Sequence, residues 1–294
     1  MRHDEYAQIN GLNLHYVREG DGDKVILFLH GFPEFWYMWR NQLTEFGQDH
    51  TAIAMDMRGY NLSDKPAHVD DYAMPNLIAD VRAMLDRFAP GKKSILVAHD
   101  WGGGVAWAFA LAHPEYLEKL IIINCPHPAI FARELKNNPA QQKASAYTIF
   151  FRSEAAEPAL SENNYARLAK VVFDAAAKPD AYNTEDRAAY LAAWSQPGAL
   201  TGGLNYYRAS KIGLPAPGEE RREPRSFGDM NNLIVHVPTL VIWGEQDTAL
   251  LPPCLDGMES FIPDLRVRRI PAGSHWVVHE EPALVNQHIA EFIR

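Results

Sequence analysis

The sequence is poor in cysteine and has no long apolar run. Its 294 residues include two cysteines, Cys125 and Cys254. They lack the spacing of a metal site and are too few for a disulfide framework, so we expect reduced thiols. No segment approaches the roughly 18 apolar residues that a membrane span needs. The first ten residues also have no apolar stretch of the signal-peptide type. These absences predict a cytoplasmic protein that does not contact a membrane.

The sequence also has fewer basic than acidic residues. Lys and Arg number 28 against 37 Asp and Glu, which gives a formal net charge of −9. Because nucleic-acid binding requires a basic surface, we expect no nucleic-acid partner. Apolar residues at 47% and charged residues at 22% exclude a disordered or fibrous chain. The length fits two average domains or one large α/β domain with an insertion, and the sequence leaves a homodimer open.

Strand and helix signals alternate along much of the chain. Short apolar runs of the kind expected for buried parallel strands occupy Val25–Leu29, Thr51–Met55, Ser94–Val97, Leu120–Ile123 and Thr239–Trp243. Apolar residues at helical spacing extend from Leu77 to Phe88 and from Val285 to Phe292. Asn10–Tyr16 alternates like a half-exposed strand in an antiparallel start to the sheet. We predict an α/β fold with a mostly parallel central sheet and helices on both faces.

The alternation of strands and helices stops near Pro126. Residues from about 129 to 231 are rich in alanine and predicted to be helical, and they end in a stretch rich in Pro, Gly and charge (211–232) that is typical of a surface connection. We therefore predict a core made of residues 1–128 and 232–294, with an inserted helical cap at residues 129–231.

The segment Ser94–Gly104, SILVAHDWGGG, carries the strongest chemical signal. An apolar strand leads into a sharp turn with Asp100 at its apex, and a helix begins among glycines. This is the pattern of a nucleophile elbow, Gly-x-Ser-x-Gly, with Asp in place of Ser and Ala98 in place of the first Gly. Small residues suit such a tightly packed strand–turn–helix. The alternative is that Asp100 only caps the helix.

Two later segments favour a catalytic interpretation of Asp100. VIWGEQD is a strand ending in Asp247, and PAGSHW places His275 in a loop after a short strand. The order nucleophile, acid, histidine is typical of the α/β-hydrolase fold. Glu245 is a weaker candidate for the acid, and Asn124 does not compete because it is not ionisable.

Segments along nearly the whole chain resemble the soluble epoxide hydrolases of the α/β-hydrolase fold. They are HGFPEFWYMW, MDMRGY, HDWGGG, NYYR, GEQD and GSHW, from about Asn10 to the C-terminus. Ala98 is the main departure, and His30 in the first motif is expected to be structural. The resemblance implies conversion of an epoxide and water to a vicinal diol without a metal or organic cofactor. HGFPE and HDWGG are shared in part with haloalkane dehalogenases, which remain the alternative.

A carboxylate nucleophile suits attack on a saturated carbon. Its ordinary pKa of about 3.9 keeps it ionised, and it forms an ester that water can cleave, whereas a serine would leave an ether. We expect a covalent ester on Asp100 and hydrolysis by a water that His275, oriented by Asp247, activates. The backbone N–H groups of Phe32 and Trp101 are expected to hold the oxyanion.

The leaving group distinguishes the two enzyme families. An epoxide opens to an alkoxide, which needs a proton donor, and phenols with a pKa of about 10 suit that role. By resemblance, Tyr147 in SAYTIFF and Tyr207 in GLNYYR occupy the positions of the two ring-opening tyrosines. The alternative is that both are ordinary packing residues. Tyr206 is expected to face elsewhere if its segment is helical.

Other assignments fit the chain less well. Haloalkane dehalogenases usually have a second Trp for the halide, or an Asn directly after His-Gly, where this chain has Phe32. Fluoroacetate dehalogenases have arginines at the positions of Trp101 and Gly104. A non-catalytic binding protein is disfavoured because the whole constellation is present. By resemblance, Trp36 and Trp101 are expected to contact the substrate, which an apolar pocket would select as a small lipophilic epoxide.

Overall fold

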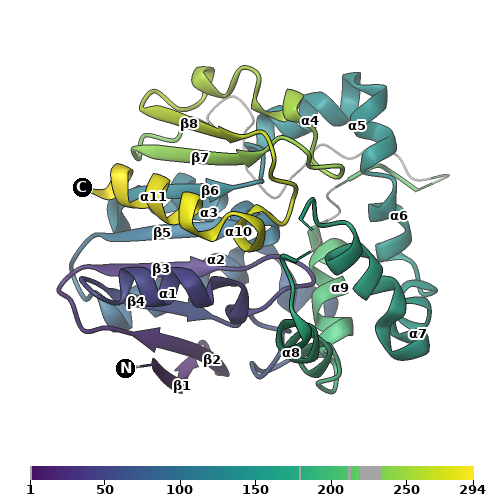
Figure 1. Ribbon diagram of the computed structural model, residues 1–294, viewed down its shortest axis with the longest axis horizontal. Coiled ribbons are helices and arrows are strands. Elements are labelled where there is room, and N and C mark those ends of the chain that lie inside the picture. The colour runs from purple at the N-terminus through teal and green to yellow at the C-terminus, as the bar shows by residue number, and fades with distance from the viewer. Residues whose placement is uncertain (1, 179, 211–212, 217, 219–232) are drawn as a thin grey trace.

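A central β-sheet with helices on both faces forms the core of the molecule (Figure 1). The computed structural model describes residues 2–178, 180–210, 213–216, 218 and 233–294. Within these residues the sheet has eight strands. They are β1 (Arg2–Ile9), β2 (Leu12–Glu19), β3 (Val25–Leu29), β4 (Thr51–Met55), β5 (Ser94–His99), β6 (Leu117–Ile123), β7 (Thr239–Gly244) and β8 (Leu265–Ile270).

The strands lie in the order β1-β2-β4-β3-β5-β6-β7-β8. From β4 to β8 each pair of neighbours is parallel, whereas β1 and β2 form an antiparallel edge. Because the parallel strands share a direction, the loops that follow β3, β5, β6 and β7 leave the sheet at the same carboxyl edge. The predicted α/β fold with a mostly parallel sheet is confirmed.

Four helices of the core cover the two faces of the sheet. Helices α1 (Arg40–Phe46) and α11 (Pro282–Ile293) lie on one face, and α2 (Met74–Phe88) and α3 (Asp100–Ala112) lie on the other (Figure 1). Short helical segments connect these elements: η1 (Trp36–Trp39), η2 (Val69–Tyr72), η3 (Pro114–Tyr116), η7 (Pro252–Leu255), η8 (Met258–Ser260) and α10 (Val277–Glu280).

Strand β3 shows why the predicted strands are continuous apolar runs. Ile26 and Phe28 pack into the cluster beneath α1 and α11, while Leu27 and Leu29 pack into the cluster beneath α2 and α3. All four side chains are at most 1% exposed. Because both faces are covered, polar residues have no place in the strand. Each such burial stabilises the fold by about 1.5–3 kcal/mol.

The N-terminal edge differs from the prediction. The expected strand at Asn10–Tyr16 begins only at Leu12, because Asn10 and Gly11 form the turn between β1 and β2 with φ values of 50° and 81°. An Asn-Gly pair is typical of two-residue hairpins, which need a positive φ at both positions. Strand β1 was not predicted, since its residues are mostly polar and half of them are exposed.

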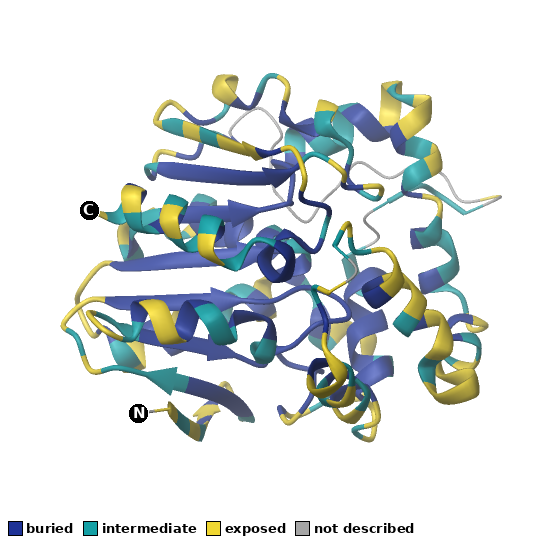
Figure 2. Ribbon diagram, in the orientation of Figure 1, coloured by how far each residue is buried: buried dark blue, intermediate teal, exposed yellow. Residues whose placement is uncertain are grey.

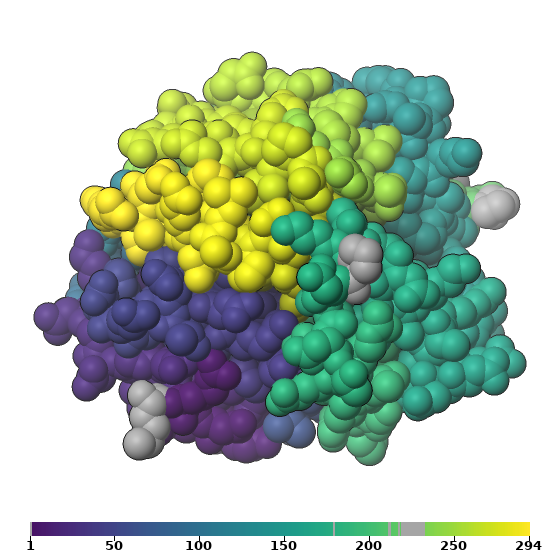
Figure 3. All heavy atoms as spheres, in the orientation of Figure 1, coloured from purple at the N-terminus to yellow at the C-terminus, as the bar shows by residue number. Residues whose placement is uncertain are grey.

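Between β6 and β7 the chain forms a group of helices, which we call the helical insertion. They are α4 (Pro128–Asn137), α5 (Pro139–Ala144), α6 (Tyr147–Arg152), α7 (Ala156–Ala169), η4 (Lys170–Asp174), α8 (Thr184–Trp194) and α9 (Ala199–Ser210). Helices α6 to α9 lie beyond the carboxyl edge of the sheet (Figure 1) and form the teal and green surface that abuts the core in Figure 3. Their exposed residues face outward in Figure 2.

The insertion is less regular than its alanine-rich sequence predicts. Four residues within α7, from Glu162 to Tyr165, have non-helical backbone angles, and η4 is a π-helix. The connection predicted at residues 211–232 lies largely outside the described residues, as does the predicted boundary between residues 231 and 232. In the described part of the chain, no helix is both long and apolar enough to cross a bilayer.

Candidate active site

Asp100 lies at the sharp turn between β5 and α3. Its backbone has a φ of 49°, a left-handed conformation that is costly for a residue with a Cβ atom. The helix that follows begins very close to other backbone. A Cβ on Gly102 would lie 2.4 Å from the carbonyl oxygen of Leu29, and one on Gly103 would lie 2.5 Å from the Cβ of Cys125. These two glycines therefore permit the tight turn that projects Asp100.

The Asp100 carboxylate is held by the loop after β3. The backbone N–H of Phe32 donates a hydrogen bond to Asp100 Oδ1 at 2.8 Å. The backbone N–H of Trp101, in the first turn of α3, belongs to the helical donors that have no acceptor within the helix. Gly31 permits the close approach of the two loops, because a Cβ there would lie 2.4 Å from Asp100 Oδ1. The residue that precedes α3 as its N-cap is His99, so Asp100 is not that cap.

His275 follows β8 and bonds to Asp247, which follows β7. His275 Nδ1 lies 2.7 Å from Asp247 Oδ2. The same oxygen accepts a hydrogen bond from the Asn124 side chain at 2.8 Å, and Oδ1 accepts the N–H groups of Ala249 and Leu250. The Asp247 side chain is fully buried, and these bonds satisfy both of its oxygens. Because Nδ1 donates to Asp247, Nε2 is the nitrogen directed at Asp100.

The charges of Asp100, Asp247 and His275 shift the pKa values within this group. His275 Nε2 lies 3.7 Å from Asp100 Oδ2, too far for a direct hydrogen bond. Burial opposes the charged imidazolium, but the charge and hydrogen bond of Asp247 and the charge of Asp100 prevail and raise the pKa of His275 to about 9. Burial likewise opposes the Asp247 carboxylate, yet the charge of His275 holds the pKa of Asp247 below its usual value.

A buried ionic cluster lies behind His275. His99 Nε2 bonds to the backbone oxygen of His275 at 2.9 Å, and His99 Nδ1 lies 3.0 Å from Glu34 Oε2. Glu34 Oε1 contacts His279 Nε2 at 2.7 Å and accepts the Tyr190 hydroxyl at 2.9 Å. Burial opposes the charge on Glu34, but these histidines hold its pKa well below the usual range. Through His99, the cluster holds the backbone of His275 in place.

A cavity of about 570 Å³ opens from Asp100 and His275 toward the helical insertion. Its walls are largely aromatic and apolar, and they include Phe32, Tyr147 and Tyr207. The Tyr147 and Tyr207 ring centroids are 6.4 Å apart. Burial and the negative charge of Asp100 raise the pKa of both phenols, so both are neutral proton donors at ordinary pH. The structure thus brings the two predicted tyrosines into one space with Asp100.

Two predicted substrate contacts have other surroundings. Trp36 does not line this cavity; its ring packs on Phe35 and Tyr37, and Arg2 lies 5.8 Å from its centre. Trp36 is therefore not among the residues that line this cavity, and its contact with substrate stays a prediction. Trp101 also does not line the cavity.

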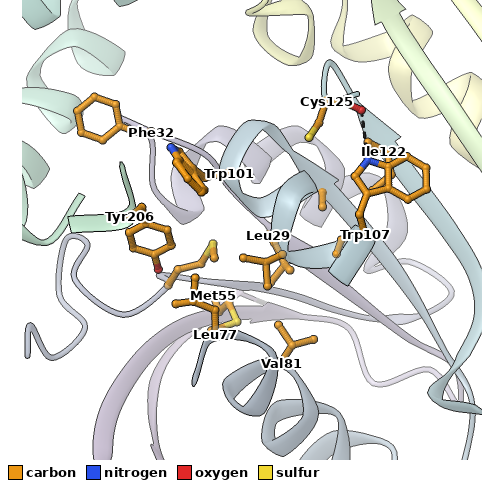
Figure 4. Close-up of a cluster of buried hydrophobic side chains, with 14 of the residues drawn as sticks. Leu29, Phe32, Met55, Leu77, Val81, Trp101, Trp107, Ile122, Cys125 and Tyr206 are labelled. Carbon is orange, nitrogen blue, oxygen red and sulfur yellow. Dashed lines mark hydrogen bonds between the residues drawn. The ribbon is translucent and has the colours of Figure 1, made fainter. Parts of the chain in front are cut away.

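Trp101 lies one layer deeper. Its ring packs edge-on against Tyr207, with 4.9 Å between ring centroids, so it supports the cavity wall. It also packs edge-on against Tyr206 at 5.7 Å, and these two rings are labelled in Figure 4. Tyr206 faces away from the cavity, as expected, and its hydroxyl bonds to the backbone oxygen of Arg58 at 2.9 Å. Glu245 pairs with Arg269 at the surface, which leaves Asp247 as the acid beside His275.

Sequence reasoning missed several polar neighbours of this site. Asn124 cannot ionise and is therefore not a predicted member of the site, yet its side chain donates a hydrogen bond to Asp247 and its backbone has a φ of 42°. Glu34 lies in the HGFPE motif and His99 lies in the HDWGG motif. Their places in these two motifs were the only sequence features that could have indicated that they belong to the site. His30 has the structural role expected, because its Nε2 accepts the backbone N–H of Met57 at 3.0 Å. Among the described residues, no three or more His, Cys, Asp or Glu side chains are arranged so that they could hold a metal ion.

Comparison with known proteins agrees with this geometry. Residues 24–282 match the family model described as alpha/beta hydrolase fold. The chain is 39% identical to the AB hydrolase superfamily protein YfhM of Bacillus subtilis (strain 168) over 99% of this chain and 97% of that one. It is 36% identical to epoxide hydrolase 4 of Mus musculus, over 97% of this chain and 77% of that protein.

Solved structures give the same result. The crystal structure of an epoxide hydrolase from Bacillus megaterium in complex with an inhibitor superposes with a TM-score of 0.91 at 38% identity, covering 98% of this chain and 99% of that one. Together with the sequence relatives, this shows that the chain belongs to the epoxide hydrolases of the α/β-hydrolase fold.

Proposed function

We propose that this protein converts an epoxide and water to a vicinal diol through a covalent ester on Asp100. The observation that carries the proposal is the convergence of four side chains on one cavity. Asp100 and His275 lie at its base, and the phenols of Tyr147 and Tyr207 line the same space. A nucleophile, a base and two proton donors are the groups that ring opening and ester hydrolysis require.

In the first step, one carboxylate oxygen of Asp100 attacks a ring carbon. Oδ1 already accepts the Phe32 N–H, so Oδ2 is the oxygen left for attack. A C–O ester bond forms as the C–O bond of the strained ring breaks, and the electron pair of that bond moves to the epoxide oxygen. Oδ1 then becomes the ester carbonyl oxygen.

Tyr147 and Tyr207 supply the proton that the opened ring oxygen takes up. Their raised pKa values make them weak acids in the resting enzyme, partly because of the nearby Asp100 charge. As the ester forms, that charge leaves Asp100 and develops on the substrate oxygen beside the phenols. The proton therefore becomes easier to transfer at the moment when it is needed.

In the second step, His275 removes a proton from water, and the hydroxide attacks the ester carbonyl carbon of Asp100. The oxyanion forms on Oδ1, where Phe32 N–H already donates at 2.8 Å and Trp101 N–H is the expected second donor. Collapse of this intermediate breaks the ester C–O bond, and the leaving alkoxide takes the proton from His275 to complete the diol. The proton left on the new Asp100 carboxyl group returns to the tyrosine phenolate, which restores the carboxylate and both phenols. The 3.7 Å gap between His275 and Asp100 suits a base that acts on water rather than on Asp100 itself.

The helical insertion acts as a cap in this proposal. We assign residues 129–231 to the cap and residues 1–128 and 232–294 to the core, because the cavity lies between the two and the cap supplies both tyrosines. The largely apolar walls favour a small lipophilic epoxide. A cytoplasmic location and a homodimer stay predictions from the sequence.

A single-turnover experiment in ¹⁸O-labelled water tests the proposal. With enzyme in excess over styrene oxide, we expect the unlabelled oxygen of Asp100 to enter the diol and one ¹⁸O atom to enter the peptide that contains Asp100. Direct attack by water would instead label the diol and leave the peptide unchanged. A parallel assay with a bromoalkane measures halide release. Halide release without any diol formation would assign the chain to the dehalogenases.

A further inference from the structure

The cavity is charged at two separate places. Asp100 and His275 form its base, and the only other charged residues in its walls, within the described chain, are Arg167 on α7 and Lys170 at the start of η4. Both of these cations are exposed, whereas the base of the cavity is largely buried. Positive charge therefore lies at the open side of a cavity in a protein whose net charge is −9.

Neither cation forms a salt bridge in the part of the chain that the structure describes. Within the described residues, no carboxylate lies within ion-pair distance of Arg167 or Lys170. The Arg167 guanidinium lies 5.8 Å from the centre of the Phe150 ring, which is itself part of the cavity wall. This contact holds the guanidinium along the wall and leaves its N–H groups available to a ligand.

The backbone that carries these cations is unusual. Asn163, Asn164 and Tyr165 have φ values of 51°, 55° and 61°, a left-handed conformation that is uncommon for a residue with a side chain and least so for Asn. A π-helix then begins at Lys170. Irregularities of both kinds are frequent at functional sites, and here the left-handed residues precede Arg167 while the π-helix includes Lys170.

We propose that Arg167 and Lys170 form an anion subsite, which binds a negatively charged group at the end of the substrate remote from the epoxide. This inference rests on the proposed epoxide hydrolysis and narrows its substrate class to amphiphilic epoxides. The apolar wall between the two charged ends, which includes Phe151, Leu160 and Val171, covers the hydrocarbon part of such a molecule. A carboxylate is an anion that the planar arginine fork can bind through two parallel N–H groups.

The proposed subsite predicts a higher kcat/KM for anionic than for neutral epoxides, and this preference should depend on salt concentration. Exposed pairs contribute little individually, so two of them predict a preference on the order of tenfold for a carboxylate over its methyl ester at low ionic strength. The preference shrinks as the Debye length falls from about 30 Å at 0.01 M to about 8 Å at 0.15 M salt. Because the subsite is remote from the reacting carbon, the difference appears mainly in KM.

The test uses terminal epoxides with an ω-carboxylate, the matched methyl esters, and a chain-length series of both. The double variant Arg167→Gln/Lys170→Gln removes both cations, and Lys143→Gln removes an exposed cation on α5 that does not line the cavity. We expect wild type and Lys143→Gln to prefer the carboxylate, and the double variant to turn over carboxylate and ester alike. A phosphate monoester of the same length reports whether the subsite favours a carboxylate or accepts any anion.

Styrene oxide, which has no anionic group, separates the two proposals. Equal kcat/KM on styrene oxide in all variants, with loss of the carboxylate preference only in the double variant, supports the subsite. An unchanged preference in the double variant, or no preference and no salt dependence in wild type, overturns it while leaving epoxide hydrolysis intact. Failure of wild type to hydrolyse styrene oxide and the whole series would instead contradict the proposed function.

Discussion

Replacing Asp100 by Asn should lower the pKa of His275. In the wild type that pKa is raised to about 9, and the Asp100 carboxylate is one of its causes. The substitution keeps the size of the side chain and removes the charge that lies 3.7 Å from His275 Nε2. It therefore mimics the state in which Asp100 is esterified and neutral, which is the state in which His275 must act as a base.

The magnitude follows from Coulomb's law. At 3.7 Å, an effective dielectric constant between that of water and about 20 gives an interaction of roughly 1 to 4.5 kcal/mol, or about one to three pKa units. The side chains of His275 and Asp100 are 12% and 13% exposed, so the effective dielectric constant lies between these two values. We expect the pKa of His275 to fall to between about 6 and 8 in the variant.

An NMR titration of the His275 ring measures this pKa, and the signal is identified by its loss in His275→Gln. Asp256→Asn, which removes an exposed aspartate that does not line the cavity, is the matched control and should leave the pKa unchanged. An unchanged His275 pKa in Asp100→Asn would refute the idea that ester formation releases the base. The same raised pKa means that charge on His275 stabilises the fold below about pH 6.5 and that this contribution is lost as pH rises through about 9.

Three further predictions concern other parts of the site. The double change Tyr147→Phe/Tyr207→Phe should reduce epoxide turnover by about 10²–10⁴-fold, the usual contribution of a general acid, and unaltered kcat would show that neither phenol donates a proton. Gly31→Ala should abolish turnover, because the added Cβ would lie 2.4 Å from Asp100 Oδ1. Gly104→Ala is the control: its added Cβ would have no atom within 4 Å, so the variant should retain activity and have a melting temperature at least as high as that of the wild type. Glu34→Gln should lower the free energy of unfolding by about 1–3 kcal/mol near neutral pH, because it weakens the contacts that the buried carboxylate makes with His99, His279 and the Tyr190 hydroxyl. Folding lowers the pKa of the Glu34 carboxyl, so the stability that its charge contributes is lost as pH falls below about 4.3. The difference in free energy of unfolding between wild type and variant, measured by urea unfolding, should therefore become smaller at low pH. A difference that is the same at every pH would contradict the role given to the Glu34 charge.

The parts of the fold that were predictable are those in which one local pattern dominates. Strands β3 and β4 are buried on both faces, so their apolar runs start and end at the predicted residues. Strand β1 was not predictable in this way, because it is an edge strand with one face in solvent and its residues are mostly polar. Its Asn10-Gly11 turn was the stronger signal.

The candidate site was predictable where a residue's chemistry and its place after a strand coincide. Asp100, Asp247 and His275 each follow a strand of the parallel sheet, and the fold brings such loops together at one edge. The direction of a side chain within a loop has no such signature, which is why Trp36 was expected at the substrate yet does not line the cavity. Asn124 was missed for another reason: its role depends on a hydrogen bond to Asp247, 123 positions later in the chain.

Trapping the covalent intermediate tests the central claim most directly. His275→Gln removes the base of the second step and leaves Asp100 and the tyrosines in place. After incubation with styrene oxide, the intact protein should gain the mass of one epoxide, and digestion should locate the adduct on the peptide containing Asp100. The combined variant Asp100→Asn/His275→Gln should show no adduct. An adduct on another residue, or no adduct with any epoxide and a clear one with a bromoalkane, would contradict the account.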